Sequence, residues 1–552
     1  MRQTRRRFLT VAGLGSVGAL AGCAGSPGAQ DGGGNDGSGA TTDSPSDGNT
    51  ATGTAAVQSY GWQEATWDAY WYSLYNMSTN IAMSGNGVLF PHNDAQQQAF
   101  EERFPAMLEA ADQDAPPIAN PNLNMAPFTK GDPHFTRQPV FDDGTGRPDA
   151  STLTWDTAES SGVVSPSSLA WTHTKGVTWA KNFQNHFDIL PPSLAAEFRS
   201  EVLTTLAQIG TNAALIAGGP AENGALTKGD GFELASSFRP ADGTQVDETA
   251  RPHHHASMLW FLSDLTSLAT GGWFGYENPE PLIPAEKIQG LTDGLAQTTM
   301  SLFPPDEVVE MGSTRDLGLM LGAVGWYGTH AGSSDLRSKA AAYGNALADR
   351  AEEAITDGKV EDGASNQAAT QGVVGQGLVW ASQVDGIDRT GPAEDVLTWM
   401  LERLWDDDAG TFKSTVDAST YTISARDAGD ITGGLNAADA VLGLDVQDTF
   451  ARFFNQTFNR GRLQRAERPQ SRNEDAEFTL PLPPAAGGEH GQAAVYNAEV
   501  EYDPGADEWR VTDGTFDTEA ALYLANQDIW VGQWGGQFYQ GRGVPGTNDQ
   551  PA

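Results

Sequence analysis

Polar side chains at the start of apolar segments are the residues of this sequence best suited to chemistry. Four segments rich in small and apolar residues begin near His253, Thr314, Asn366 and Arg426, about 50 to 60 residues apart, and a fifth begins at Asp517. Two carboxylates that face one another can act as general acid and base on a glycosidic bond or at a sugar carbon. This pattern gives four carboxylates as catalytic candidates: Asp316, Asp427, Asp430 and Glu519. It gives the amide of Asn366 as a substrate-binding candidate.

The same side chains also suit a structural role. Asp and Asn cap helix N-termini, and acidic residues in a first helical turn are favoured by the helix dipole. With 72 Asp and Glu in 552 residues, such positions arise easily, so capping stays open as the alternative.

Three consecutive histidines, His253, His254 and His255, are weak candidates for a metal site. Neighbouring residues on a helix point about 100° apart, so three in a row cannot all bind one ion from a helix. If the segment is still a loop after Pro252, two of them could bind zinc or copper together with a remote His330, His173 or His186. The alternative is that the three histidines form the polar start of a helix. In that case we predict that the chain binds no metal and no cofactor.

Aromatic side chains that could stack on sugar rings cluster near residues 60–75. Trp67 and Trp71 lie on one side of a predicted helix, and Trp326 lies on the helix predicted at 314–331. We name these three tryptophans as candidate substrate-binding residues, with packing in the core as the alternative.

Helical periodicity dominates the chain beyond residue 57. Helices that are apolar nearly all round alternate with amphipathic ones, which predicts inner helices covered by outer helices. The predicted helices span 58–82, 95–113, 165–187, 191–217, 253–270, 284–303, 314–331, 334–357, 364–383, 392–405, 427–441, 446–460 and 517–530. The best strand signal is a hairpin at 499–511, with Pro504-Gly505 at its turn.

Residues 401–412 read Leu-Glu-Arg-Leu-Trp-Asp-Asp-Asp-Ala-Gly-Thr-Phe. This stretch resembles the turn that ends an outer helix in the α/α-toroid (six-hairpin) superfamily, and the resemblance covers about residues 190–530. It implies a mainly α fold, an α/α toroid of helical hairpins with a small β-hairpin near the C-terminus, in which the polar starts of the inner helices converge on a shared funnel. The superfamily includes glycosidases, sugar epimerases, polysaccharide lyases and terpenoid cyclases, so the fold alone does not choose an activity.

The first 23 residues predict export and lipid anchoring. Residues 4–10 resemble a twin-arginine signal, a short apolar stretch follows, and Leu-Ala-Gly-Cys at 20–23 resembles a lipobox with Cys23 as the lipidated residue. Residues 24–56, rich in Gly, Ser, Asp and Thr, predict a flexible tether. Residues 57–552 form the predicted toroid domain, with an irregular, loop-rich part at 57–190. The sequons at Asn76 and Asn455 would be glycosylation acceptors only where exposed.

The charge of the chain restricts its partners. A formal charge of −40, with 8 Lys against 24 Arg, repels nucleic acid and resembles secreted proteins of extreme halophiles. We expect a monomer on the outer face of the cytoplasmic membrane, whose partners are the membrane, through Cys23, and a carbohydrate. The leading hypothesis is a surface lipoprotein that binds or processes that carbohydrate, with a glycoside hydrolase, lyase or sugar epimerase as the enzyme classes. The alternatives are a non-catalytic binding or scaffold lipoprotein, for instance beside a membrane redox complex, and a His-based metal carrier.

Overall fold

The computed structural model describes residues 60–90, 123–136, 140, 149–186, 226–228, 231–271, 284–361, 366–465 and 492–531. The predicted signal, Cys23, the tether and the helices expected at 95–113 and 191–217 lie outside these residues. Within the described ranges, no helix combines the length and the apolar character that a membrane crossing requires.

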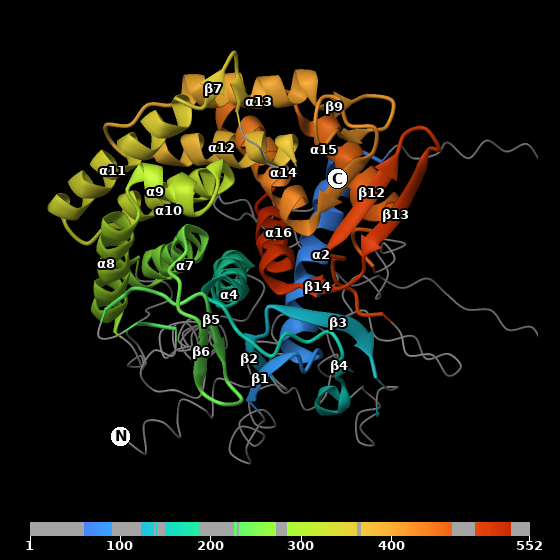
Figure 1. Cartoon of the computed structure of the whole chain (residues 1–552), viewed down its shortest axis with the longest axis horizontal. Helices are drawn as coiled ribbons and strands as arrows, with labels where there is room; N and C mark the ends of the chain where they lie inside the picture. Colours follow the sequence, from blue (N-terminus) through green and yellow to red (C-terminus); the bar gives the residue numbers. More distant parts are fainter. Residues whose placement is uncertain are drawn as a thin grey trace, which may run out of the picture.

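Six helices of the described part form a closed inner ring (Figure 1). Each packs against the next, and the last packs back against the first. In ring order they are α4 (Pro166–His186), α7 (Pro252–Thr270), α10 (Thr314–His330), α12 (Gln367–Ala381), α14 (Ala425–Ala437) and α16 (Thr518–Trp530). Because α4 is one of them, the ring extends into the N-terminal part that the sequence predicts to be irregular.

Small residues let the inner helices approach closely. A Cβ added to Gly372 on α12 would lie 2.3 Å from the carbonyl oxygen of Asp430 on α14, so only glycine fits there. Every residue of α12 is buried, which explains why its sequence is apolar nearly all round. Gly318 lies against Val373, and Gly325, two turns further along α10, lies against Trp380, so α10 and α12 run parallel.

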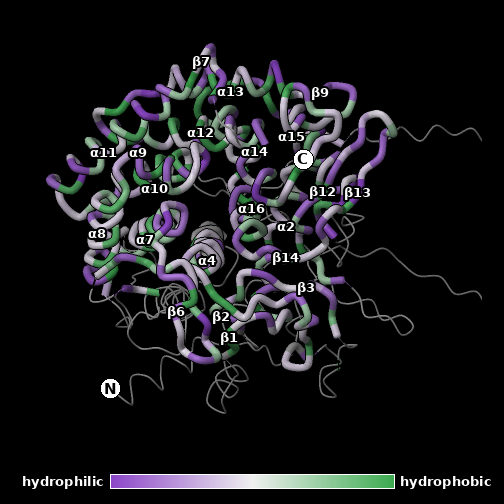
Figure 2. The backbone as a smooth tube through the Cα atoms, in the orientation of Figure 1, coloured by the Kyte–Doolittle hydropathy of each residue, from purple (hydrophilic) through white to green (hydrophobic). Residues whose placement is uncertain are grey.

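Outer helices, most of them amphipathic, cover the ring. They are α2 (Trp62–Ala82), α8 (Ala285–Leu302), α11 (Ser334–Glu352), α13 (Thr390–Arg403) and α15 (Gln447–Phe454), with the short α9 (Pro305–Met311) before α10. On α11 the buried face consists of Ala340, Gly344, Leu347, Ala348 and Ala351. Hydrophilic residues are frequent at the periphery, as on α11 and the β12–β13 hairpin in Figure 2. Two π-helical turns, η4 (Ala438–Leu442) and η5 (Asn455–Arg460), end the helices expected at 427–441 and 446–460.

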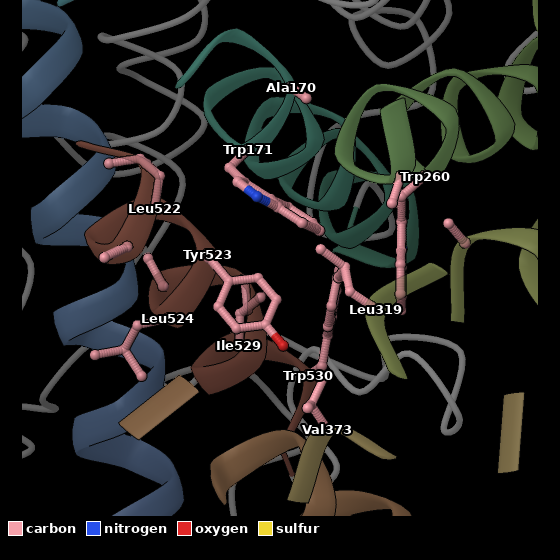
Figure 3. Packing of buried hydrophobic residues seen from close by; sticks show 14 of the residues in the cluster. Ala170, Trp171, Trp260, Leu319, Val373, Leu522, Tyr523, Leu524, Ile529 and Trp530 are labelled. Carbon is pink, nitrogen blue, oxygen red and sulfur yellow. The ribbon is translucent and has the colours of Figure 1, made fainter. Parts of the chain in front are cut away.

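Large aromatic side chains fill the centre of the ring (Figure 3). Trp260 stacks on Trp530 with ring centroids 5.8 Å apart, and Trp171 meets Tyr523 edge-on at 4.9 Å. These side chains come from α7, α16 and α4, so the core ties together helices that are far apart in sequence. Asn76 on α2 is also fully buried and accepts a hydrogen bond from the Tyr496 backbone at 2.8 Å, which removes its sequon from solvent.

Short antiparallel strands connect the helices, several of them just before an inner helix begins. The hairpin expected at 499–511 is confirmed as β12 and β13, and β11 pairs with β12 to form a three-stranded sheet. The turn at 405–412 is confirmed as the hairpin β9–β10, directly after α13. The helix expected to reach residue 357 ends at Glu352, because Asp357 and Gly358 have positive φ and form the turn of a hairpin.

The strands are β1 (Gly87–Phe90), β2 (Leu123–Pro127), β3 (Lys130–Phe135), β4 (Trp155–Asp156), β5 (Ser237–Arg239), β6 (Thr244–Asp247), β7 (Ile355–Thr356), β8 (Lys359–Val360), β9 (Trp405–Asp406), β10 (Thr411–Phe412), β11 (Tyr421–Ser424), β12 (Glu499–Asp503), β13 (Glu508–Asp513) and β14 (Phe516–Asp517). One 3₁₀ turn, η1, spans Ala150–Thr152.

Candidate functional site

The N-terminal ends of the inner helices meet at one end of the ring, which we call the mouth. Ser165, just before α4, donates a hydrogen bond to Glu519 in the first turn of α16. Arg315, at the start of α10, contacts two carboxylates of α14. The polar side chains of the mouth are Ser165, Ser167, His253, His254, Arg315, Asp316, Arg426, Asp427, Asp430, Asp517 and Glu519.

Two arginines at the mouth are held by one buried carboxylate. Asp430 is fully buried and lies 2.5 Å from Nη2 of Arg315 and 3.1 Å from Nε of Arg426. Arg315 Nη1 also lies 2.8 Å from Asp427, and the Arg426 guanidinium covers the ring of Tyr523 at 4.4 Å. Burial alone would lower the pKa of Arg315, but Asp430 and Asp427 outweigh it and hold that pKa above its ordinary value. Asp427 and Asp430 therefore fix the two guanidiniums.

The capping alternative also applies to part of this set. Ser424 is the N-cap of α14: its hydroxyl accepts from the Asp427 amide at 3.1 Å, and Asp427 accepts from the Ser424 amide at 2.9 Å. Asp427 thus belongs to a capping box with one oxygen and to an ion pair with the other. Asp517 is the N-cap of α16 and accepts from the Ala520 amide at 3.0 Å.

Three carboxylates at the mouth make no ion pair among the described residues: Asp316, Asp517 and Glu519. Burial and the neighbouring Asp517 raise the pKa of Glu519 to about 7, and burial raises the pKa of Asp517. Since the charges of Arg315 and Arg426 are offset by Asp427 and Asp430, the remaining charge of the mouth is negative.

The polar groups of the mouth are partly open to solvent. Asp517 is exposed, and His253 and Glu519 are half-buried. Polar groups that converge from several helices and remain open to solvent can contact a ligand.

The histidines divide into a pair and a single residue. His253 and His254, in the first turn of α7, have ring centroids 4.1 Å apart. One ring nitrogen of each and one oxygen of Glu519 lie within 4.8 Å of one another, so these three side chains are the group at the mouth that could hold a metal ion. His255 points elsewhere: it accepts a hydrogen bond from the Leu234 amide at 3.1 Å.

Burial sets the protonation of these rings. Burial lowers the pKa of His253, lowers that of His254 well below its usual value, and lowers that of His255 to about 3. The nearby Asp316 partly opposes the shift of His253.

The remote histidines considered from the sequence do not join this pair. His330 lies at the opposite end of α10, beside Trp326, and His173 lies against Phe261. The side chain of His186 is outside the described residues.

Of the residues expected to bind substrate, Asn366 lies at the N-terminal end of the inner helix α12, and the tryptophans whose side chains are described lie elsewhere. Asn366 is buried and caps α12: its oxygen accepts from the Ala369 amide at 3.0 Å. Trp71 is buried in the core, in contact with Tyr75. Trp326 lies at the far end of α10 against Trp380. The side chain of Trp67 is outside the described residues.

Sequence reasoning overlooked the arginines and serines of the mouth. Arg315 and Arg426 stand directly before Asp316 and Asp427 in the sequence, but a pairing between α10 and α14 has no local signal. Ser167 is visible only as part of the Ser-Pro start of a helix, whereas the structure places its hydroxyl 2.9 Å from Nδ1 of His254.

No protein-family model matches the chain, and no curated protein matches it in sequence. Among solved structures, a sugar epimerase from a ruminal bacterium is similar at 9% identity and a TM-score of 0.42, over 72% of this chain and 93% of that one. A D-mannose isomerase is similar at 9% identity and a TM-score of 0.38, over 64% of this chain and 85% of that one. The catalytic domain of Clostridium thermocellum CelT has 9% identity and a TM-score of 0.38, over 89% of this chain and all of that one.

Similarities this distant assign no activity. The fold class rests on the packing of the chain itself, in which a closed ring of inner helices is covered by outer helices. The chain is an α/α toroid.

Proposed function

We propose that the chain is a lipid-anchored surface protein that binds a carbohydrate at the mouth of the toroid and processes it there. The observation that carries the proposal is the convergence of hydrogen-bond donors and acceptors from several inner helices at one end of the ring. Arg315 and Arg426 supply donors, and Asp316, Asp517 and Glu519 supply acceptors.

A sugar matches this arrangement because each hydroxyl can donate one hydrogen bond and accept others. Guanidinium N–H groups donate to such hydroxyls, and carboxylate oxygens accept from them. Asp430 holds both arginines before a ligand arrives, so less conformational entropy is lost on binding.

The ion pairs divide the carboxylates by role. Asp427 and Asp430 position the arginines, whereas Asp316 and Glu519 are left to contact a bound ligand. We therefore assign Asp316 and Glu519 to the reacting part of the substrate, and the enzyme classes remain glycoside hydrolase, lyase and sugar epimerase.

The site of action in this proposal is the outer face of the cytoplasmic membrane. It is supported by the order of three sequence features: the twin-arginine pattern, the lipobox ending at Cys23, and the tether at 24–56. A tether of 33 residues has an average reach of about 30 Å, enough to hold the toroid clear of the membrane surface.

The test is a glycan panel, measured by calorimetry for binding and by reducing-end and epimer analysis for turnover, in molar KCl. We expect one glycan class to bind and react, and Asp316→Asn to lower turnover at least tenfold while the fold is retained. Asp335→Asn removes an exposed acid from α11 and should behave as the wild type. Binding without turnover would favour the non-catalytic alternative, and a panel without binding, or unchanged turnover in Asp316→Asn, would refute the proposal.

A further inference from the structure

We propose that His253, His254 and Glu519 bind one divalent transition-metal ion, with zinc as the best match, at an open site in the mouth. The three ligand atoms lie within 4.8 Å of one another. They come from α7 and α16, two helices that the ring brings together from opposite parts of the sequence.

The donor set favours zinc. Two imidazole nitrogens and one carboxylate oxygen are ligands that zinc accepts, and three protein ligands with a free fourth position are typical of catalytic rather than structural zinc. A tetrahedral ion about 2.1 Å from each ligand keeps ligand atoms about 3.4 Å apart. Since the ligand atoms lie within 4.8 Å of one another, the side chains have to close by up to about 1.4 Å around the ion.

Two serines at the start of α4 hold the ligands in place. The Ser167 hydroxyl lies 2.9 Å from Nδ1 of His254 and is itself 3.0 Å from the Ser257 hydroxyl. Ser165 donates to Glu519. Outer partners of this kind orient metal ligands, and their loss typically weakens binding. Here one short segment orients ligands on two different helices.

The local charge also favours a cation. The N-termini of α7 and α16 carry partial positive charge, which opposes a cation. Asp316 and Asp517 add two negative charges that no ion pair among the described residues offsets, and the nearby Arg426 is already paired with Asp430. Arg251, the other arginine that acts on His253 and His254, is paired with Asp247.

A bound ion would supply Lewis acidity to a ligand oxygen in the mouth. The metal site does not depend on the carbohydrate proposal, because it requires only the three ligands and their serines. Metal binding can be present in a chain that binds no glycan, and glycan binding can be present in a chain that binds no metal.

The experiment uses the full chain, stripped with a chelator and dialysed against zinc chloride in molar KCl, with bound zinc measured by elemental analysis. We expect one zinc per chain, lost in the His253→Ala/His254→Ala double variant. Ser167→Ala should lower the zinc affinity about 10–100-fold, and His330→Ala, at the other end of α10, should leave it unchanged. Circular dichroism checks that each variant is folded, and if the double variant does not fold, Ser167→Ala and Glu519→Gln carry the test.

Cobalt substitution separates this site from loose binding to an acidic surface. A four-coordinate cobalt site with two histidines gives intense visible absorption, whereas cobalt held by hydrated carboxylates gives weak octahedral bands. An octahedral spectrum, no zinc after dialysis, an unchanged zinc affinity in folded Ser167→Ala, or full zinc content in folded Glu519→Gln would overturn the proposal.

Discussion

Substitution of Asp430 should destabilise the fold strongly, and Asp430→Asn tests whether the loss of its negative charge is the cause. The side chain is fully buried and contacts both Arg315 and Arg426. Asparagine keeps the shape but removes the charge, which leaves two guanidiniums at the mouth with only Asp427 to offset them. Removing one partner of a buried ion pair costs about 3–5 kcal/mol, and we expect a loss of this size in the free energy of unfolding.

The assay is urea-induced unfolding in molar KCl, followed by tryptophan fluorescence. Asp335→Asn is the matched control: it makes the same chemical change in an exposed i,i+4 pair with Lys339 and should cost about 0–1 kcal/mol. The double variant Arg315→Met/Asp430→Asn should lose less free energy of unfolding than the sum of the two single variants. The reason is that each substitution removes a charge that the other substitution would leave without its partner. Equal losses in Asp430→Asn and Asp335→Asn, or full additivity in the double variant, would show that Asp430 does not hold the arginines.

The remaining predictions concern packing, salt and anchoring. Gly372→Ala should lower the free energy of unfolding by about 1–3 kcal/mol, because its Cβ would meet the backbone of α14. The control Gly290→Ala on α8, where a Cβ would have no atom within 4 Å, should raise the free energy of unfolding by about 0.4–1 kcal/mol. Equal effects of the two substitutions would contradict the close approach of α12 and α14. Lowering KCl from about 1 M to about 0.1 M lengthens the screening distance from roughly 3 Å to 10 Å, so the melting temperature should fall, and an unchanged value would argue against a halophilic surface. Cys23→Ser should release folded protein from membranes into the medium in cell fractionation, and a variant that still sediments with membranes would rule out the lipid anchor.

The helices and the alternation of inner and outer helices could be predicted because their signals are local. Ser165-Pro166 marks a helix start, the 405–412 turn marks a helix end, and the apolar character of 367–381 marks a buried helix. Helix ends were less accurate where turn geometry decided them, as at Asp357 and Gly358.

The mouth could be predicted only as a region. Its contacts join residues far apart in the chain: Arg315 and Asp430 are 115 positions apart, and Ser165 and Glu519 are 354 apart. No rule of sequence spacing relates residues this far apart, so their contacts become visible only in the folded ring. The position of the aromatic residues could not be predicted for another reason, since Trp71 is as well suited to a buried core as to a sugar ring.

Hydrogen–deuterium exchange with and without a saturating glycan tests the central claim, that ligands bind where the inner helices begin. We predict that the ligand slows exchange in the segments around 165–168, 251–257, 313–318, 424–430 and 516–521, which are separate in sequence and adjacent in the toroid. Slower exchange confined to the opposite ends of these helices, such as 326–331 or 378–382, would contradict the account, as would unchanged exchange with every glycan of the panel.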